Sequence, residues 1–310
     1  MSKVLFSADL HIKLGQRNVP KDWQINRFRL LFKELLALEK KVDYHVIGGD
    51  IYDRVPTLEE QVLFAEYLVQ VKIPTIIFSG NHEASKKGRT FFEVLKPMYE
   101  RLNPNITVVI GTAELLGMDI IPYEDLKTFK PSDFSNDILL THVRGAIEPH
   151  VKPEIDLTKF DRWKVVFAGD LHSHSNCQRN IVYPGSPMTT TFHRGSTKTG
   201  VIIFDSETGE YEWIHLKLPQ LIRKTVESED DMVPTEFDHT IYELTGDLSN
   251  LAKANKVNPL LDKKIVKRKV EATLDFSNLE TIEAELVAYL KKIKGIKNTD
   301  NISRRFNDNI

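Results

Sequence analysis

Five apolar runs in this chain each end in a short polar cluster that contains Asp, Asn or His. The runs cover residues 4–7, 44–47, 75–78, 138–140 and 165–168, and they are predicted to be buried strands. The clusters that follow them are Asp9-Leu10-His11, Gly49-Asp50-Ile51-Tyr52-Asp53, Gly80-Asn81-His82-Glu83, Thr141-His142 and His172-Ser173-His174. In open α/β sheets, ligands bind outside the carboxyl ends of the strands. The five clusters are therefore predicted to meet at a single site.

The composition is that of an ordinary globular protein, and the length suggests one large domain and one smaller one. The chain has 310 residues, of which 41% are hydrophobic and 28% charged, and its formal net charge is −2. Any contact with DNA therefore needs local Lys and Arg side chains. The single cysteine, Cys177, excludes an internal disulfide. Because no apolar run approaches the ~20 residues that span a bilayer and no secretory signal is evident, we expect a cytoplasmic protein.

The first part of the chain alternates between predicted strands and helices. Apolar residues at helical spacing predict a helix over 26–40, and a second helix follows Pro56-Thr57, where Thr57 and Glu60 have the spacing of a capping box. This alternation predicts parallel strands with right-handed crossovers. After about Arg101, short strands separated by turn signals predict a second, mixed sheet. We therefore expect an α/β fold, a four-layer αββα sandwich with helices outside both sheets.

A second unit is predicted to begin after Leu218-Pro219, where the composition becomes more charged. Residues 1–218 then form the domain that carries the five clusters. Residues 219–310 form a small α+β cap that contacts DNA or a partner. Within this cap, 270–276 is a candidate strand and 281–293 is a candidate amphipathic helix.

The residue types in the clusters suit a pair of metal ions. Within the first and last clusters the donors are two residues apart, so they point the same way from an extended segment. Asp50 follows Gly48-Gly49, where the backbone can turn sharply and approach a metal. Mixed nitrogen and oxygen ligands suit manganese, iron or zinc better than calcium or magnesium. Two such ions can generate hydroxide and clamp the attacking and leaving oxygens of a phosphoryl displacement.

The clusters and their order resemble the calcineurin-like metallophosphoesterase superfamily, whose pattern is D-x-H, G-D-x-x-D, G-N-H-E, H and G-H-x-H. The resemblance covers roughly residues 3–204. It implies that Asp50 bridges two divalent cations and that His82 is an unbound imidazole that stabilises the transition state or protonates the leaving oxygen. Asp53 would then orient His82. The metal ligands that the resemblance implies are Asp9, His11, Asp50, Asn81, His142, His172 and His174.

The last of these motifs departs from the family pattern. The chain reads Gly169-Asp170-Leu171-His172-Ser173-His174 where the family has Gly-His-x-His. Either the late pair is His172 and His174, shifted by two positions, or Asp170 replaces the first histidine and His172 is the second. We favour the pair of histidines, because it keeps both imidazoles.

Within the superfamily, the chain is most similar to the SbcD-type nuclease subunit of DNA double-strand-break processing complexes. The similarity lies in the first cluster and the segment before it, in the second cluster followed by Pro56, and in Tyr183-Pro184-Gly185-Ser186-Pro187 after the late histidines. This resemblance implies manganese-dependent exonuclease and endonuclease activity in DNA repair, recombination or replication. It also implies a homodimer and a coiled-coil ATPase partner of the SbcC type.

Several basic residues are candidates for contact with a DNA phosphate. Arg89 ends the run Lys86-Lys87-Gly88-Arg89, Arg144 comes two residues after His142, and Lys267 and Arg268 lie in a basic run of the second unit. Solvated surface charge explains the first two about as well. A strand edge protected by lysines explains the last two about as well.

Two other functions compete with the nuclease. A protein or small-molecule phosphatase of the same superfamily would share Gly-Asp-x-x-Asp-Arg54 and Gly-Asn-His-Glu. Against this reading, Arg54 is followed by Val rather than by the Gly of protein phosphatases, and His142 is followed by Val-Arg rather than by Gly-Gly. A non-catalytic scaffold that binds an ATPase would keep the fold alone. The intact set of donor residues argues against that scaffold.

Overall fold

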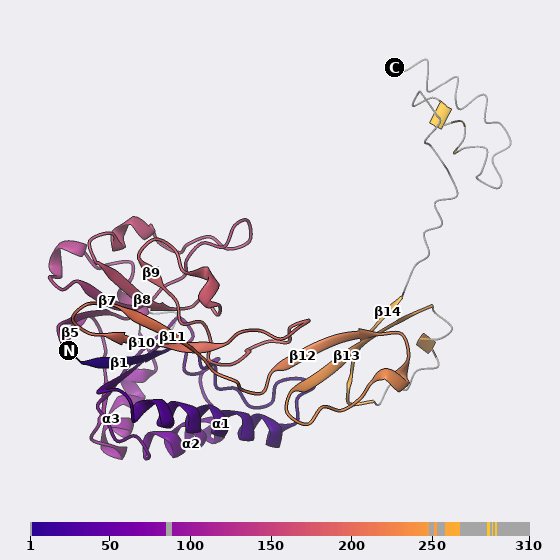
Figure 1. Cartoon of the computed structure of the whole chain (residues 1–310), viewed down its shortest axis with the longest axis horizontal. Helices are drawn as coiled ribbons and strands as arrows, with labels where there is room; N and C mark the ends of the chain where they lie inside the picture. The colour runs from indigo at the N-terminus through magenta and orange to yellow at the C-terminus, as the bar shows by residue number, and fades with distance from the viewer. Residues whose placement is uncertain are drawn as a thin grey trace.

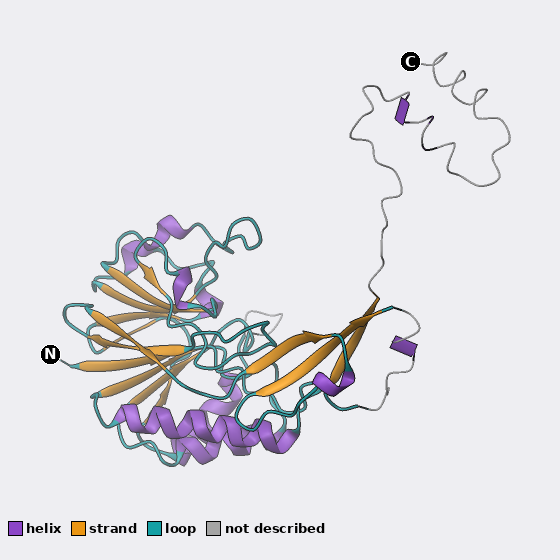
Figure 2. Cartoon of the chain, turned by 45° about the vertical axis from the view of Figure 1, so that its right-hand side comes forward, coloured by secondary structure: helices purple, strands orange, loops and turns teal. Residues whose placement is uncertain are grey.

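Two facing sheets form the body of the molecule, and a smaller third sheet extends from it (Figures 1 and 2). This computed structural model describes residues 2–84, 89–247, 251–252 and 258–266, together with residues 284, 285, 287 and 289. Apart from those last four positions, the predicted strand 270–276 and the predicted helix 281–293 lie outside the described residues.

The first sheet is mixed and has six strands in the order β11-β10-β1-β2-β3-β4. Its strands are β1 (Lys3–Ser7), β2 (Tyr44–Gly48), β3 (Thr75–Phe78), β4 (Ile106–Val108), β10 (Gly200–Asp205) and β11 (Tyr211–His215). Strands β1 to β4 pair in parallel, which confirms the arrangement predicted from the alternation of strands and helices. The late strand β10 pairs with β1 in the antiparallel sense and brings the hairpin β10–β11 to the edge of the sheet.

Three helices pack against one face of this sheet: α1 (Lys21–Glu39), α2 (Leu58–Leu68) and α3 (Phe92–Leu102). Helix α1 begins at Lys21, five residues earlier than predicted, because Pro20 at its N-cap has the extended conformation that opens a helix. The predicted capping box of α2 is confirmed. The Thr57 side chain accepts from the Glu60 amide, and the Glu60 side chain accepts from the Thr57 amide.

The second sheet has five strands in the order β5-β6-β7-β8-β9. They are β5 (Ala113–Leu115), β6 (Met118–Ile121), β7 (Ile138–His142), β8 (Val165–Gly169) and β9 (Ile181–Val182), and only β5 is antiparallel to its neighbour. In the part of the chain that the structure describes, its outer face is covered by loops and short 3-10 helices. These are η1 (Tyr123–Asp125), η2 (Pro131–Asp133) and η3 (Leu157–Phe160). The expected outer layer of α-helices is wrong, because aromatic side chains on these loops fill that face instead.

The main core lies between the two sheets. Alternate residues of each strand point into it, as the period of a β-strand requires. Phe6 and Phe204 come from the first sheet and Leu140 and Phe167 from the second, and all four are buried. The rings of Phe167 and Phe204 stack with their centroids 4.1 Å apart. This packing fixes how the loops at the strand ends of one sheet face those of the other.

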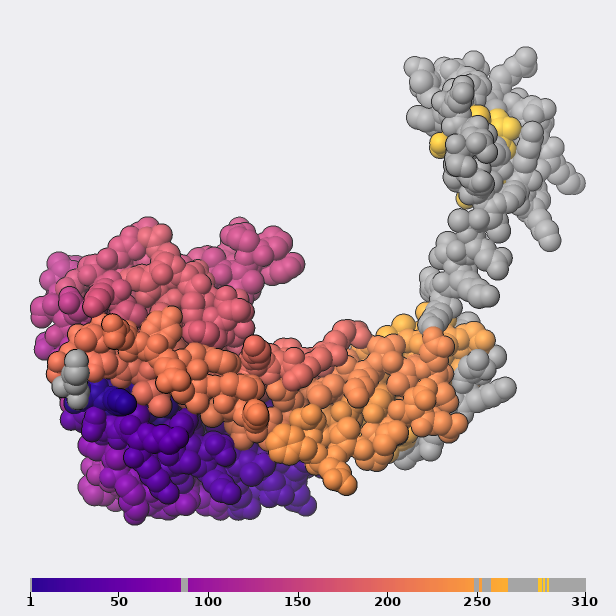
Figure 3. Space-filling model, in the orientation of Figure 1, coloured from indigo at the N-terminus to yellow at the C-terminus, as the bar shows by residue number. Residues whose placement is uncertain are grey.

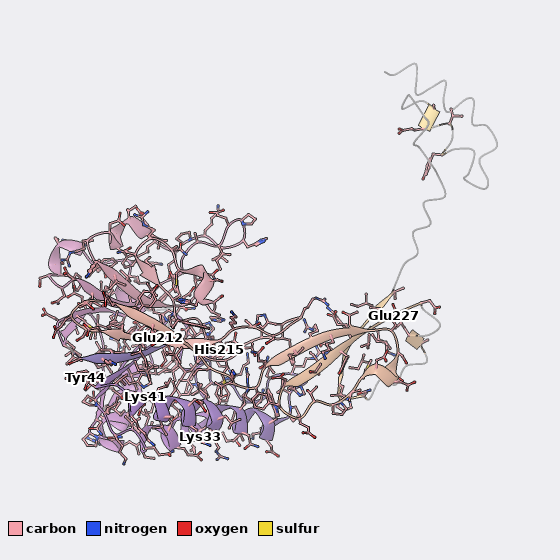
Figure 4. The ribbon with its side chains drawn as sticks, in the orientation of Figure 1. Lys33, Lys41, Tyr44, Glu212, His215 and Glu227 are labelled. Carbon is pink, nitrogen blue, oxygen red and sulfur yellow. The ribbon has the colours of Figure 1, made fainter. Side chains whose placement is uncertain are left out.

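The third sheet is parallel and contains β12 (Leu221–Val226), β13 (His239–Gly246) and β14 (Leu261–Val266), with η5 (Glu229–Asp231) beside it. One face carries a small apolar core with Met232, Tyr242, Leu244 and Leu251. Figure 4 shows Glu227, just after β12, at the end of this sheet away from the body that carries Lys33 and Tyr44. The boundary after residue 218 stays a prediction. Among the described residues, no helix is both long and apolar enough to cross a membrane.

The joint between the third sheet and the body is polar and buried. The guanidinium of Arg27 on α1 donates through Nε to the Pro219 carbonyl at 2.7 Å and through Nη2 to the Thr189 carbonyl at 2.6 Å. The His193 amide donates to the Leu221 carbonyl, and the Arg223 amide donates to the His193 carbonyl. The loop between β9 and β10 therefore runs along β12 and links the two parts.

Candidate metal centre

The polar clusters meet where the carboxyl ends of β1, β2, β3, β7 and β8 converge. Asp9, Asp50 and Asn81 lie just after β1, β2 and β3, His142 is the last residue of β7, and Asp170 follows β8. The first three strands are neighbours in one sheet, and β7 pairs with β8 in the other. The two sheets face each other (Figure 2). Residues far apart in the sequence therefore come together at one end of the sandwich.

The backbone at this end is strained in a way that marks functional sites. Asp9, His11, Asp50 and Asp170 all have positive φ values, of 56°, 45°, 52° and 98°, in a region that non-glycine residues rarely adopt. Gly80 permits this crowding, because a Cβ built on it would overlap Asp50 Oδ1. Four strained residues that all carry donor side chains indicate a binding site rather than a structural accident.

One group of donors surrounds His11. The Nε2 atoms of His11 and His172 lie 3.0 Å apart, and Asp50 Oδ2 lies 3.5 Å from His11 Nε2. Asp9, His11 and His172 each offer a ligand atom within 4.8 Å of the others. Thr190 Oγ1 forms a hydrogen bond with Nδ1 of His172 at 3.1 Å. The other ring nitrogen of His172, Nε2, is therefore the atom turned toward Asp9 and His11.

A second group surrounds His142 and shares Asp50 with the first. Asp50 Oδ2 lies 3.4 Å from His142 Nε2, and the Asn81 side chain lies 3.1 Å from the same nitrogen. His142 Nδ1 donates to the Gly48 carbonyl at 2.9 Å, which fixes the ring so that Nε2 is the atom turned toward Asp50 and Asn81 and the one that would bind a cation. The structure thus brings together six of the seven predicted ligands, with Asp50 between two groups.

His174 is the seventh predicted ligand, and the structure does not place it in either group. Its Nδ1 bonds to the Tyr183 carbonyl at 2.7 Å. Its ring stacks on Trp213 with centroids 5.3 Å apart and planes 13° apart. His174 therefore packs against β11, and the structure does not support the favoured His172/His174 pair.

Asp170, the alternative to His174, lies beside both donor groups. Its amide donates to both carboxylate oxygens of Asp9, at 3.0 and 3.2 Å. Its own carboxylate receives two hydrogen bonds from Arg144, at 3.1 and 3.2 Å. The side chain of Asp170 is buried, whereas that of Arg144 is partly exposed.

His82 lies beside the ligands with one side open. Its ring meets that of His11 edge-on, its Nε2 is 3.9 Å from Asp50 Oδ2, and its side chain is 34% exposed. Its Nδ1 donates to the backbone carbonyl of Asp53 at 2.6 Å. The expected orientation of His82 by the Asp53 carboxylate is therefore corrected, because the carbonyl of the same residue does this.

The Asp53 carboxylate instead faces Lys13 and His11. Lys13 Nζ donates to Asp53 Oδ2 at 2.6 Å, and Asp53 Oδ1 lies 3.6 Å from His11 Nδ1. That nitrogen is buried and has no hydrogen bond. Contact with His11, and then with Lys13, holds the pKa of the Asp53 carboxyl below its ordinary value.

An open cleft of about 420 Å³ lies over these groups. Asp50, Asn81, His82 and Asp170 line it near the strand ends, and the loops that contain Ile147 and Thr190 line its sides. Figure 3 shows the surface hollowed between the body and the third sheet. The donor groups are therefore accessible from solvent through this cleft.

The four candidates for substrate contact have different positions. Arg144 lines the cleft, although its guanidinium is paired with Asp170. Arg89 is exposed and does not line the cleft. Lys267 and Arg268 lie outside the described residues, directly after β14.

The calcineurin-like phosphoesterase family matches residues 2–174 of the chain. The chain belongs to the calcineurin-like phosphoesterase family. It is 40% identical over 316 residues to "Probable exonuclease subunit 1" of Escherichia phage T5, and this alignment covers 96% of this chain and 95% of that protein. It is 27% identical over 240 residues to a protein of Invertebrate iridescent virus 6 provisionally named phosphoesterase 244L, and this alignment covers 67% of this chain and 79% of that protein.

Solved structures with a lower likeness include TT1561 of Thermus thermophilus. It aligns with 68% of this chain and 97% of its own length, at 13% identity and a TM-score of 0.44. Family membership rests on the sequence matches, and it makes this chain a phosphoesterase.

The donor set of this phosphoesterase fits cations. Burial raises the pKa of Asp9 to about 7. Burial also acts to raise the pKa of Asp50, but His142, followed by His11 and His82, outweighs it and lowers that pKa below its ordinary value. Burial, with help from the charge of His11, lowers the pKa of His172 to about 3. At neutral pH Asp50 is therefore ionised and His172 is neutral, and these are the forms that bind metals. Although burial opposes it, nearby carboxylates raise the pKa of His11 and of His142, so a cation would bind these two imidazoles by displacing a proton.

Glu83 supports the centre in a way that sequence reasoning missed. Its buried carboxylate accepts from the amides of Asp50, Tyr52 and Gly80 at 2.8, 3.0 and 2.8 Å. It thus ties the loop after β2 to the loop after β3 in this phosphoesterase. The only signal in the sequence was its place at the end of Gly-Asn-His-Glu, and no role had been assigned to it.

Proposed function

We propose that this phosphoesterase is the nuclease subunit of a DNA-processing complex and cleaves phosphodiester bonds of DNA with two divalent cations. The observation that carries the proposal is the pair of donor groups that share Asp50 on the floor of an open cleft. The similarity to the exonuclease subunit of phage T5 extends over nearly the whole of both chains, which supports DNA as the substrate and a second subunit as the partner.

In this proposal the first cation is held by Asp9, His11, Asp50 and His172. The second is held by Asp50, Asn81 and His142, and one further donor is considered below. The ligands are imidazoles, carboxylates and an amide, and this mixture suits Mn²⁺. When bound, two such cations supply a hydroxide at neutral pH and neutralise charge on the phosphate.

His82 acts on the leaving oxygen in this mechanism. Its Nδ1 is held by the Asp53 carbonyl, so the ring is fixed and Nε2 is the nitrogen left to face the reacting phosphate. As an imidazolium, it donates the Nε2 proton to the oxygen that departs from phosphorus. Its partial exposure to the cleft agrees with this role, because a buried metal ligand would have no open side.

The DNA is proposed to run from the cleft toward the third sheet. The loop between β9 and β10 connects them and carries Arg194, whose side chain is 68% exposed while its guanidinium reaches Glu243. Lys263 on β14 contacts the same carboxylate. Lys267 and Arg268, which follow β14 in the sequence, stay candidates for contact with a DNA phosphate.

A homodimer is proposed through an apolar patch on α2 and α3. The patch consists of exposed side chains on one face of each helix and just after α2: Leu58, Val62, Val69, Val94, Met98 and Leu102. The two helices contact each other, and the spacing of four residues places the three α3 positions on one stripe. Exposed apolar side chains on two neighbouring helices are candidates for an interaction site. A coiled-coil ATPase of the SbcC type is proposed as a separate partner. This proposal rests on the resemblance to SbcD-type nuclease subunits and on the similarity to an exonuclease subunit of phage T5.

The deciding experiment is cleavage of end-labelled linear duplex DNA by the full chain with and without Mn²⁺, alone and with a coiled-coil ATPase. We expect manganese-dependent release of labelled nucleotides that His82→Ala abolishes while Mn²⁺ binding persists. His150→Ala is the matched control, because it changes an exposed histidine on the turn beside the cleft that is not among the residues that line it. Hydrolysis of phosphopeptides without any cleavage of DNA would establish the phosphatase, and a chain that binds no metal would establish the scaffold.

A further inference from the structure

We propose that Asp170 is a ligand of the second cation, so that this site is richer in oxygen than the first. The inference rests on the proposed two-cation centre and assigns the donor that the departure from Gly-His-x-His left open. It depends on three observations: where Asp170 lies, what surrounds the Asn81 amide, and how Arg144 balances the charge.

The position of Asp170 is set by the first sheet as well as by its own strand. Its backbone amide donates to both oxygens of the Asp9 carboxylate, at 3.0 and 3.2 Å. Its φ of 98° lies in the sparsely populated region that three proposed ligands, Asp9, His11 and Asp50, also occupy. The two hydrogen bonds to Asp9 therefore hold the loop after β8 against the proposed metal centre. This loop also shares the positive φ of the other loops that carry proposed ligands.

The surroundings of Asn81 show where a cation fits. One terminal atom of its amide lies 3.1 Å from Asp50 Oδ2, 3.2 Å from Asp170 Oδ1 and 3.1 Å from His142 Nε2. His142 Nδ1 donates to a carbonyl, so in the neutral ring, the form that binds a metal, Nε2 is an acceptor, as both carboxylate oxygens are. Three acceptors around one point are held together either by an amide NH₂ or by a cation. If the oxygen of the Asn81 amide is the atom at that point, then this oxygen, Asp50 Oδ2, Asp170 Oδ1 and His142 Nε2 are four donors that one cation could bind together.

Arg144 makes an extra carboxylate tolerable. Its guanidinium donates to both oxygens of Asp170, at 3.1 and 3.2 Å, and its side chain is 42% exposed at the edge of the cleft. A carboxylate has about four lone-pair positions, so Asp170 can accept from Arg144 and still bind a cation. Three carboxylates, from Asp9, Asp50 and Asp170, then face two divalent cations and one guanidinium.

The consequence concerns the choice of metal. The second site would have oxygen donors from Asp50, Asn81 and Asp170 and one nitrogen donor from His142, whereas the first has two carboxylates and two imidazoles. Oxygen donors favour Mg²⁺ and Mn²⁺, and imidazole favours Zn²⁺. We therefore expect the second site to bind Mn²⁺ over Zn²⁺ more strongly than a site with the family's histidine would.

The test counts and ranks bound metals in the full chain by elemental analysis and calorimetric titration, so the readout does not depend on activity. We expect two Mn²⁺ in the wild type and loss, or at least about tenfold weakening, of one of them in Asp170→Asn. Asp170→His should bind two cations but increase the preference of that site for Zn²⁺ over Mn²⁺ by at least about tenfold. His174→Ala is the matched control and should bind two Mn²⁺ as the wild type does.

The possible failures are distinct. A wild type that binds no cation would contradict the proposed function, and this inference with it. A wild type with two Mn²⁺, together with an Asp170→Asn variant that keeps both at unchanged affinity, would overturn only the role of Asp170. Loss of one Mn²⁺ in His174→Ala would also overturn it. The retention of two cations by Asp170→His distinguishes a lost ligand from a misfolded loop.

Discussion

The Nε2 atoms of His11 and His172 lie 3.0 Å apart, although 161 positions separate the two residues in the chain. His11 Nε2 also lies 3.5 Å from Asp50 Oδ2, and the same oxygen lies 3.4 Å from His142 Nε2. Acceptor atoms repel one another at such distances unless protons or cations lie between them. The folded chain therefore concentrates, in one place, groups that a divalent cation would bind and stabilise.

Adding Mn²⁺ should raise the melting temperature of the protein, and removing it with a chelator should lower it. A ligand that binds only the folded state at 100 times its Kd stabilises that state by about 2.7 kcal/mol. Calorimetric scans with chelator and with increasing Mn²⁺ measure the effect. His172→Ala should give a smaller rise because it removes a ligand of the first cation. Identical melting temperatures with and without Mn²⁺ would contradict a metal centre at these residues.

Asp53→Asn should weaken the binding of the first cation about 10- to 100-fold, the usual cost of losing a residue that orients a metal-bound imidazole. The reason is that the Asp53 carboxylate faces His11 Nδ1, whereas the Asp53 carbonyl holds His82 and survives the substitution. Titration with Mn²⁺ measures the change, and Asp133→Asn on the exposed η2 turn is the control. Unchanged Mn²⁺ affinity combined with slower cleavage would show instead that the carboxylate serves His82.

Glu60 should make the protein more stable at neutral pH than in acid. Burial opposes its ionisation, but hydrogen bonds from the Leu14 and Thr57 amides and from Arg54 prevail, so its folded-state pKa is lowered from 4.5. For an acid with a lowered pKa, the stabilisation is present above the unfolded pKa. It is lost as the pH falls through the folded pKa.

Glu60→Gln should therefore cost about 2 kcal/mol of unfolding free energy at pH 7. That cost should shrink as the pH is lowered below 4.5. Urea titrations across this range measure it. Glu59→Gln is the control, because Glu59 is exposed and its ion pair with Lys21 lies on the surface. A cost that does not change with pH would contradict the role of the ionised carboxylate.

The double substitution of Val62 and Val94 by Glu should convert the proposed homodimer into a monomer. Both side chains are exposed, at 60% and 78%, and charge at the centre of an apolar interface is strongly unfavourable. Light scattering during size-exclusion chromatography measures the mass. Val233→Glu, at an exposed position near the third sheet, should leave the mass unchanged. If the wild type is monomeric at a protein concentration of tens of micromolar, the proposed dimer through α2 and α3 is wrong.

Much of the architecture follows from local patterns. Apolar runs that end in Asp, Asn or His predicted β1, β2, β3, β7 and β8 and the end of the sheets where ligands gather. The Thr57–Glu60 spacing predicted the start of α2. These features depend on backbone geometry and on neighbours a few residues away, so a sequence read in short windows contains them.

Other features depend on contacts between distant segments. The outer face of the second sheet is filled by Phe160, Trp163 and their neighbours on loops, which no helical period announces. The spacing of Asp53 and His82 does not reveal that a carbonyl, rather than the carboxylate, bonds the imidazole. Such choices are made by packing once the two sheets have come together.

The sequence alone determined that five strand ends carry metal-binding side chains, because residue type and strand period are local properties. Only the tertiary structure shows that His174 lies away from the two donor groups and that Asp170 lies beside them. The ring of His174 gains a stacking partner in Trp213, 39 positions later in the chain, while the amide of Asp170 gains the carboxylate of Asp9, 161 positions earlier. The energy of each choice lies in contacts that exist only after both sheets are assembled.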